Sequence, residues 1–181
     1  MLSEKMRITV SSRKILRFSE TDLAFYKKYA SAVLKTLRKP MFQRFLRWML
    51  TTENIHEEKV ENIHVIFFPF RKENGKGLAG RCNSKGEIYI YPKKLKFYHK
   101  LMSKLGKKEV HSYVKDRAKA TLIHELLHLK YKSDEKKVRK LTKKYLDIFQ
   151  RTVQNLEENA TLEAQHQIVK FRKSSFSLAK I

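Results

Sequence analysis

The chain has 181 residues, a length typical of one domain, and 41% of them are hydrophobic, which is enough for a core. Its 5 Gly and 3 Pro argue against a loop-rich or disordered protein, and a single cysteine, Cys82, excludes an internal disulfide framework and a cysteine-built zinc finger. The single cysteine also favours a reducing, intracellular compartment, so we expect a cytoplasmic protein. We find no signal-peptide pattern in residues 1–10 and no apolar run of membrane-spanning length, so we expect no membrane span.

The charge is strongly unbalanced. Lys and Arg number 41 against 18 Asp and Glu, which gives a formal net charge of +23 and a pI of about 10.1. Such an excess predicts attraction to polyanions, either nucleic acid or an anionic membrane surface. The alternative is a generically basic protein without a polyanionic partner.

The N-terminal third is predicted to contain short strands and then helices. Residues 6–10 (MRITV) and 15–18 (ILRF) have strand character. Ser19 or Thr21 offers an N-cap for a helix whose apolar residues recur at three- and four-residue spacing from Leu23 to Leu37. Pro40 ends or kinks that helix.

A second helical run, residues 41–50 (MFQRFLRWML), follows directly. Arg44, Arg47 and Trp48 stand beside its apolar face, and basic residues next to an aromatic ring suit nucleic-acid contact. A solvated cationic face on a core helix is the alternative.

The middle of the chain predicts two strands around a long turn. Residues 62–70 (NIHVIFFPF) are rich in branched and aromatic side chains, which is typical of a strand. Residues 71–86 hold four of the five glycines and are predicted to be loop and turn throughout. In residues 86–92 (GEIYIYP), Ile88 and Ile90 are expected on one face of a strand, with Tyr89 and Tyr91 on the other.

The remainder is predicted to be helical, first over residues 95–105, then over a helix from about residue 110 that carries the motif below, and then from Ser133 to Leu156. The order of helices, small sheet and helices predicts an α+β fold. We expect a single domain with N-terminal strands and helices (1–60), a core (61–141), and a C-terminal helix with a basic tail (142–181). Lys93, Lys94 and Lys96 are further candidates for nucleic-acid contact.

The chemical motif is His-Glu-x-x-His at residues 124–128, within TLIHELLHLKYKSDEKKV. On a helix, His124 and His128 face the same way about one turn apart, so both can bind one Zn²⁺. Glu125 can then hydrogen-bond a water on that metal, accept its proton and deliver the proton to a leaving amine. The flanking leucines predict a core helix, in which two histidines need partners. A pair of ordinary, otherwise satisfied histidines is the alternative.

The third ligand is predicted to be a carboxylate. A turn before Ser133, the expected N-cap of the last helix, could swing Asp134 back to the zinc, and Glu135 is the second choice. Both acids could instead merely complement a helix N-terminus. Distant alternatives lie in the last helical stretch: Glu157, Glu158, Glu163 and His166.

The segments GRCNSKGEIYIYPKKL and LIHELLHLKY resemble the SprT-like and YgjP-like zinc metallopeptidases over residues 80–141. The resemblance implies a minimal zincin-like domain with a small antiparallel or mixed sheet and an active-site helix, acting on a protein or peptide substrate. Those families have a histidine six positions after the second motif histidine and an apolar residue four positions later. Here these positions hold Asp134 and Val138, so the ligand position departs from the pattern.

The resemblance has three further implications. A substrate strand would pair with an exposed sheet edge, here residues 87–91 (EIYIY). Tyr89, Tyr91 or Tyr131 would steady the oxyanion, although ordinary packing is the alternative for each. The substrates would be proteins crosslinked to DNA. The competing hypothesis is a basic nucleic-acid-binding protein with a structural or inactive zinc site.

Overall fold

A computed structural model describes residues 6–11, 19–71 and 77–177. These residues form five α-helices, one short 3-10 helix and a small mixed sheet, which confirms the predicted α+β class. The chain divides into two compact units, Met1–Leu146 and Asp147–Ile181, and the division falls inside the last helix. None of the helices in the described part combines the length and apolar character that a bilayer crossing requires.

The main sheet has four strands in the order β1-β2-β6-β5. β1, β2 and β6 run parallel, and β5 is antiparallel to β6. A separate two-stranded ribbon joins β3 to β4. The strand bounds are β1 Ile8–Ser11, β2 Ile63–Ile66, β3 Phe70–Arg71, β4 Gly77–Leu78, β5 Gly80–Cys82 and β6 Ile88–Ile90.

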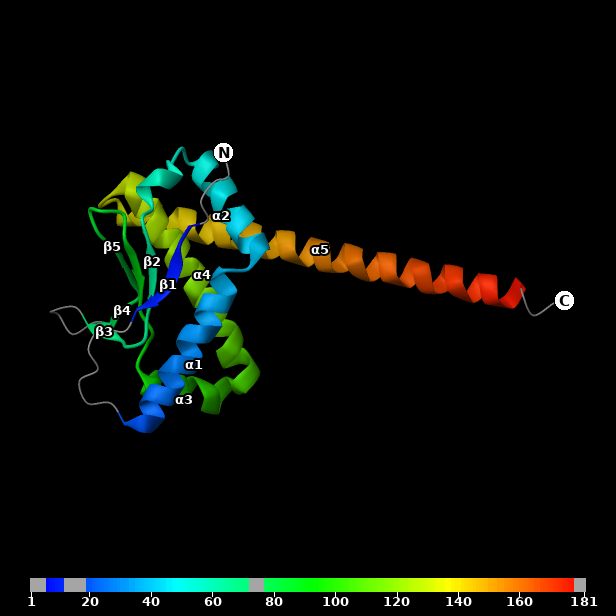
Figure 1. Cartoon of the computed structure of the whole chain (residues 1–181), viewed down its shortest axis with the longest axis horizontal. Helices are drawn as coiled ribbons and strands as arrows, with labels where there is room; N and C mark the ends of the chain where they lie inside the picture. Colours follow the sequence, from blue (N-terminus) through cyan, green and yellow to red (C-terminus); the bar gives the residue numbers. More distant parts are fainter. Residues whose placement is uncertain (1–5, 12–18, 72–76, 178–181) are drawn as a thin grey trace. The chain divides into compact units, whose positions relative to one another are not determined.

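Helices cover one face of this sheet (Figure 1). α1 (Glu20–Leu37) packs on β1 and β2, α4 (Lys107–Tyr131) packs on β5 and β6, and the two helices pack on each other. Alternation along the strands explains why, since Ile88 and Ile90 are completely buried on the helical side. Tyr89 points the other way and stacks on His64 of β2, as the strand pattern predicts.

The remaining helices are α2 (Pro40–Thr52), the 3-10 helix η1 (Glu57–Lys59), α3 (Leu95–Leu105) and α5 (Glu135–Ser177). Ser19 is the N-cap of α1 and accepts a hydrogen bond from the Asp22 amide at 3.1 Å. Pro40 stands at the first position of α2, where its missing N–H costs nothing. α5 continues well beyond Leu156, while the strand predicted at residues 15–18 lies outside the described residues.

Two predictions about the sheet were wrong. The glycine-rich segment 71–86 is not only loop, because it contains β4 and the edge strand β5. Gly80 is needed there for close packing rather than for a turn: a Cβ atom would lie 2.6 Å from Glu125 Oε1 and 2.6 Å from Thr121 Cγ2. The predicted edge, residues 87–91, is internal, since β6 lies between β2 and β5.

Candidate metal centre

The His-Glu-x-x-His motif lies on α4, the helix that packs on β5 and β6. Leu122, Ile123, Leu126 and Leu127 are completely buried, which fixes the rotation of the helix. The two histidines are therefore only half-buried, and their rings lie 4.7 Å apart between centroids. The spacing of four residues produces the shared face that the sequence predicts.

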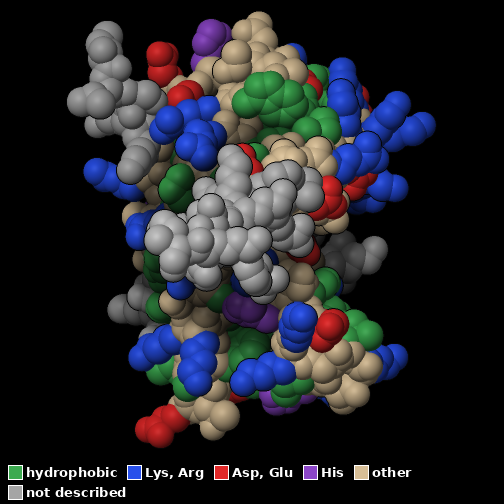
Figure 2. Space-filling view, turned by 90° about the vertical axis from the view of Figure 1, so that its right-hand side faces the viewer, with side chains coloured by type: hydrophobic (Ala, Val, Ile, Leu, Met, Phe, Trp, Pro, Cys, Tyr) green, Lys and Arg blue, Asp and Glu red, His purple; other side chains and the backbone are tan. Residues whose placement is uncertain are grey.

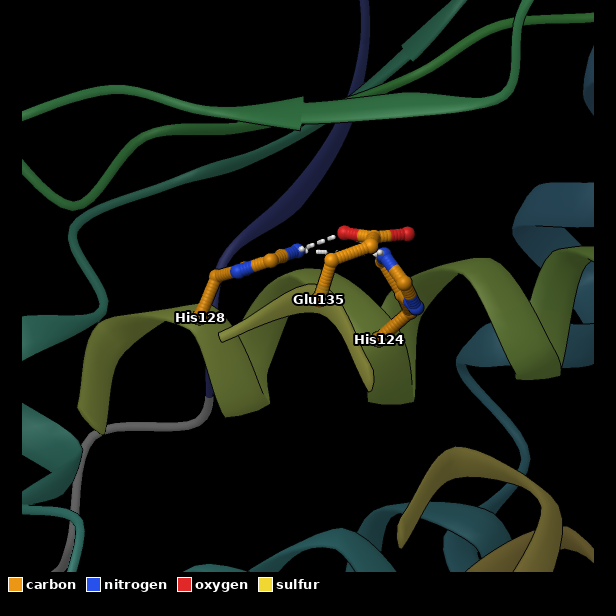
Figure 3. A group of neighbouring side chains, drawn as sticks. All are labelled: His124, His128 and Glu135. Carbon is orange, nitrogen blue, oxygen red and sulfur yellow. Dashed lines mark hydrogen bonds and ion pairs between the residues drawn. The ribbon is translucent and has the colours of Figure 1, made fainter. Parts of the chain in front are cut away.

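Three side-chain atoms converge above this helix (Figure 3). The Nε2 atoms of His124 and His128 are 3.1 Å apart. Glu135 Oε2 lies 3.3 Å from Nε2 of His128 and 3.7 Å from Nε2 of His124. Two ligands of a tetrahedral zinc ion with ordinary Zn–N and Zn–O bond lengths stand about 3.3 Å apart. The triangle therefore has the size that a single zinc ion requires.

Both imidazoles are oriented through their other ring nitrogen. Nδ1 of His128 is hydrogen-bonded to the Lys132 carbonyl, which can only accept, so this nitrogen carries the hydrogen. Nδ1 of His124 lies 3.4 Å from Thr142 Oγ1, whose own hydrogen is donated to the Val138 carbonyl at 2.8 Å. Thr142 thus accepts from His124. Each Nε2 is left with a lone pair, which is the tautomer that a metal needs.

The turn after α4 decides which carboxylate reaches the histidines. Asp134, the first choice from sequence, accepts a hydrogen bond from the Lys137 amide at 3.0 Å and caps α5. Ser133 is not the cap as predicted, because the helix begins one residue later. The Asp134 carboxylate is engaged as the helix cap, whereas Glu135, the first residue of α5, places Oε2 near both imidazoles. The structure therefore brings in Glu135, the second choice from sequence.

Among the distant alternatives, those whose side chains the structure describes are not part of this cluster. Glu157, Glu158 and Glu163 belong to the unit Asp147–Ile181. The His166 side chain lies outside the described part of the structure. Among described residues, His124, His128 and Glu135 form the one group of three or more possible metal-ligating side chains whose ligand atoms lie close together.

The protonation states also suit a metal. Burial lowers the pKa of His124, and the neighbouring His128 adds to this, although Glu135 opposes it. Burial would raise the pKa of Glu135, but its bond to Arg139 and the adjacent imidazoles outweigh burial, so this pKa lies below its ordinary value. The Arg139 Nε to Glu135 Oε1 distance is 2.7 Å. A neutral imidazole at His124 and an ionised carboxylate at Glu135 are the forms that bind metal.

The triangle opens into a groove of about 1740 Å³ between α4, β5 and the start of α5. Glu125, only 7% exposed, lines this groove beside His124 and Gly80. Cys82 also lines it, and burial together with the Glu125 charge raises the pKa of its thiol to about 11. A protonated thiol suits a small packed side chain rather than a metal ligand.

The three tyrosines considered for the oxyanion have other roles. Tyr131 donates its hydroxyl hydrogen to Glu53 at 2.5 Å, and Tyr89 donates to Glu87 at 3.0 Å. Tyr91 packs against Phe70, with ring centroids 5.4 Å apart. None of the three tyrosines lines the described groove.

The candidate nucleic-acid residues fall on two elements. On α2, Arg44 is exposed and Trp48 is 48% exposed, whereas Arg47 is tied to Glu57 with a 3.2 Å ion pair. Lys93, Lys94 and Lys96 are exposed at the start of α3.

Sequence reasoning missed Thr142 and the Lys132 carbonyl. A signal for Thr142 existed, because it lies seven residues after Glu135 and so shares its helix face. No sequence pattern predicts that the Lys132 carbonyl accepts a hydrogen bond from His128.

Comparison of the chain with family models, with curated proteins and with solved structures finds no match. The arguments for function therefore rest on the geometry of this chain.

Proposed function

We propose that this protein is a zinc-dependent metallopeptidase in which His124, His128 and Glu135 hold the ion and Glu125 is the general base. The observation that carries the proposal is the triangle of two Nε2 atoms and one carboxylate oxygen, with edges of 3.1, 3.3 and 3.7 Å, in an open groove that Glu125 also lines. A cytoplasmic location is part of the proposal and rests on the single cysteine of the chain.

The chain's own residues divide the chemistry between them. Bound zinc supplies Lewis acidity and lowers the pKa of a coordinated water towards neutrality. Glu125 accepts a proton from the attacking water and returns it to the leaving amine. Glu125 packs closely against Gly80, and this contact helps to orient its carboxylate in the groove that both histidines line. The Nδ1 hydrogen bonds of both histidines keep their Nε2 atoms aimed at the same point.

The substrate in this proposal is an extended peptide. In the described sheet, β5 is an edge strand, and the residues from Leu78 to Ser84 line the groove. A peptide that adds to this edge would gain main-chain hydrogen bonds and lie along the groove that the triangle also lines. β5 replaces residues 87–91 as the proposed docking strand.

The test combines metal content with one substitution. We expect one zinc per chain by elemental analysis. Glu125→Gln should keep the metal and lower hydrolysis of an unfolded protein substrate by about 10²–10⁴-fold, the usual contribution of general acid–base catalysis. Glu109→Gln, an exposed change on the same helix, is the control and should leave the rate unchanged. Undiminished hydrolysis in Glu125→Gln would contradict the proposed base.

A second function, nucleic-acid binding, is favoured by a lysine-rich surface around α3. Seven exposed lysines occur without any intervening Asp or Glu: Lys93, Lys94, Lys96, Lys100, Lys104, Lys107 and Lys108. Lys96, Lys100 and Lys104 follow one another at four-residue spacing, about 6 Å apart along the helix. Such like charges destabilise a helix, and a polyanion would relieve the repulsion.

Figure 2 shows one face of the molecule on which blue Lys and Arg side chains outnumber red Asp and Glu. With a net charge of +23, this surface supports a peptidase that acts on proteins associated with DNA. The rival proposal is a nucleic-acid-binding protein whose zinc site is structural or inactive.

Salt dependence tests the lysine surface. Replacing Lys96, Lys100 and Lys104 by Ala should reduce the slope of log affinity against log salt by about 2–3 for duplex DNA, since each phosphate contact contributes about 0.9. The control replaces Lys27, Lys28 and Lys35 of α1, which are also exposed, and has the same charge change. Equal slopes in the two triple variants would exclude this surface. DNA binding by metal-stripped protein, without any hydrolysis by the zinc form, would favour the rival.

A further inference from the structure

Two charged side chains are buried in the described part of the chain, Glu125 and Glu53. Glu125 lines the groove and has a role in the proposed reaction. Glu53 does not line the groove, so that reaction does not explain its burial. Glu53 stands just after α2, where its amide bonds the Met49 carbonyl at 2.9 Å. A buried carboxylate is costly unless it is fully hydrogen-bonded, so its partners indicate what it is for.

The partners of Glu53 come from both helices that build the metal centre. Oε2 accepts the hydroxyl hydrogen of Tyr131, the last residue of α4, at 2.5 Å. Oε1 accepts the hydroxyl hydrogen of Tyr145, a completely buried residue of α5. Lys130 Nζ donates to the Glu53 backbone carbonyl at 2.5 Å and lies 3.9 Å from Oε2. One carboxylate therefore ties the end of α4 to α5.

Between these two tyrosines the chain makes the turn that forms the metal centre. Lys132 has φ 45°, a left-handed conformation that is unfavourable for a residue other than glycine. Its amide bonds the His128 carbonyl at 2.9 Å, and the Asp134 amide bonds the Tyr131 carbonyl at 2.9 Å. A strained conformation of this kind persists only where the surroundings hold it.

The turn contributes to the candidate metal centre in two ways, and both depend on the conformation of Lys132. The Lys132 carbonyl is the acceptor for Nδ1 of His128. The direction in which α5 leaves the turn determines that Glu135 Oε2 stands 3.3 Å from Nε2 of His128. A small shift of the turn would therefore disturb the ring and the carboxylate together.

We propose that Glu53 is a positioning residue for the metal centre: it locks the turn between α4 and α5 through Tyr131 and Tyr145, and thereby fixes His128 and Glu135. The role of this lock in metal binding rests on the proposed function above, whereas its effect on the His128 ring does not. Glu53→Gln is the direct test, because the amide nitrogen of Gln cannot accept and one tyrosine hydroxyl loses its partner.

The first measurement needs no metal. Long-range ¹H–¹⁵N NMR of the histidine rings in metal-free protein should show His128 as a single tautomer with hydrogen on Nδ1. In Glu53→Gln we expect a mixture of tautomers at His128, with the exposed His56 and His111 unchanged. An identical His128 spectrum in folded wild-type protein and folded Glu53→Gln would overturn the inference, as would a tautomer mixture in the wild type.

The second measurement is Zn²⁺ affinity by competition with a chelator, at a temperature where every variant is folded. Loss of an outer partner of a metal site costs about 10–100-fold, and we expect about tenfold for Glu53→Gln. Tyr131→Phe keeps the ring, should weaken binding to a similar extent, and serves if Glu53→Gln does not fold. Glu57→Gln, a nearby acid paired with Arg47 at the surface, should stay within about twofold of wild type.

A double variant shows whether Glu53 and Tyr131 affect zinc binding through the same contact or independently. If Glu53 and Tyr131 act through one contact, Glu53→Gln combined with Tyr131→Phe should lose little more affinity than either single change. Full zinc affinity in both single variants would reject the positioning role while the proposed peptidase stands. A wild-type protein that binds no zinc would reject the peptidase, and the NMR measurement would still decide the role of Glu53.

Discussion

Charged side chains are paired at the end of α4, whereas around α3 they are exposed and of one sign. Around the candidate metal centre, Glu53, Glu135 and both histidines have partners at defined distances, and several of these groups are buried or half-buried. Around α3, the lysines from Lys93 to Lys108 are exposed and have no acid between them in the sequence. The first region depends on the position of individual atoms. The second depends on summed charge.

This difference predicts two kinds of response to change. Because each atom at the metal centre has a specified neighbour, a single substitution there should have a large effect that salt barely alters. Because exposed charges act at longer range and are screened, single substitutions around α3 should have small, additive and salt-sensitive effects. The following predictions sharpen or break that contrast, beginning with the largest effect.

The neighbouring acids Asp134 and Glu135 should differ most. We expect Glu135→Ala to weaken Zn²⁺ binding by more than the roughly 10–100-fold cost of losing an outer partner, since it removes a proposed ligand. Asp134→Ala should leave zinc affinity nearly unchanged and cost about 1 kcal/mol of stability through loss of the helix cap. Chelator competition and denaturant unfolding measure the two effects, and the opposite ranking in zinc affinity would restore Asp134 as the ligand.

Close packing of β5 on α4 gives the next largest effect. In Gly80→Ala the new Cβ would meet Glu125 Oε1 and Thr121 Cγ2 at 2.6 Å, so we expect a loss of about 1–3 kcal/mol in unfolding free energy. Gly77→Ala is the matched control, because no atom of the described residues, its chain neighbours aside, lies within 4 Å of its added Cβ. Denaturant unfolding of both variants measures the difference, and equal stabilities would show that the strand and helix are less closely packed.

The pH dependence of the unfolding free energy in acid tests whether Glu53 is ionised in the folded protein. Burial would raise its pKa, but the bonds from Tyr131 and Tyr145 and the nearby lysine charges outweigh burial and hold the pKa below its ordinary value of 4.5. A depressed pKa in the folded state means that the contribution is present above pH 4.5 and is lost as the pH falls through the folded value. Unfolding free energy of the wild type should therefore fall more steeply below pH 4.5 than that of Glu53→Gln. Parallel curves would contradict an ionised Glu53.

The smallest effect is expected on α3. Lys100 has like-charged neighbours one turn before and after it, Lys96 and Lys104. Lys100→Gln should stabilise the protein by a few tenths of a kcal/mol for each repulsion that is removed, since Lys and Gln have similar helix propensities. Thermal unfolding at low salt measures the gain, and about 1 M salt should abolish it. A gain that persists at high salt would point to packing rather than to charge.

Much of the fold follows from local patterns in the sequence. The three- and four-residue spacing of apolar residues predicts α1, α3 and α4, Ser19 marks where α1 begins, and the alternation of Ile88 and Ile90 with tyrosines predicts β6. The shared face of His124 and His128 follows in the same way from the helical repeat. These features depend on residues a few positions apart, whose relative geometry the backbone period sets.

Tertiary structure decided the rest. The edge strand in the glycine-rich segment forms by pairing with β6, and its Gly80 lies close to Glu125, 45 residues away in the chain. The choice of Glu135 over Asp134 depends on where α5 begins, and the anchoring of that turn by Glu53 joins residues 78 and 92 positions apart. A sequence pattern states which residues can ligate or donate. Only the packed chain determines which of them meet, because the final angle between two helices is set by contacts from a third element.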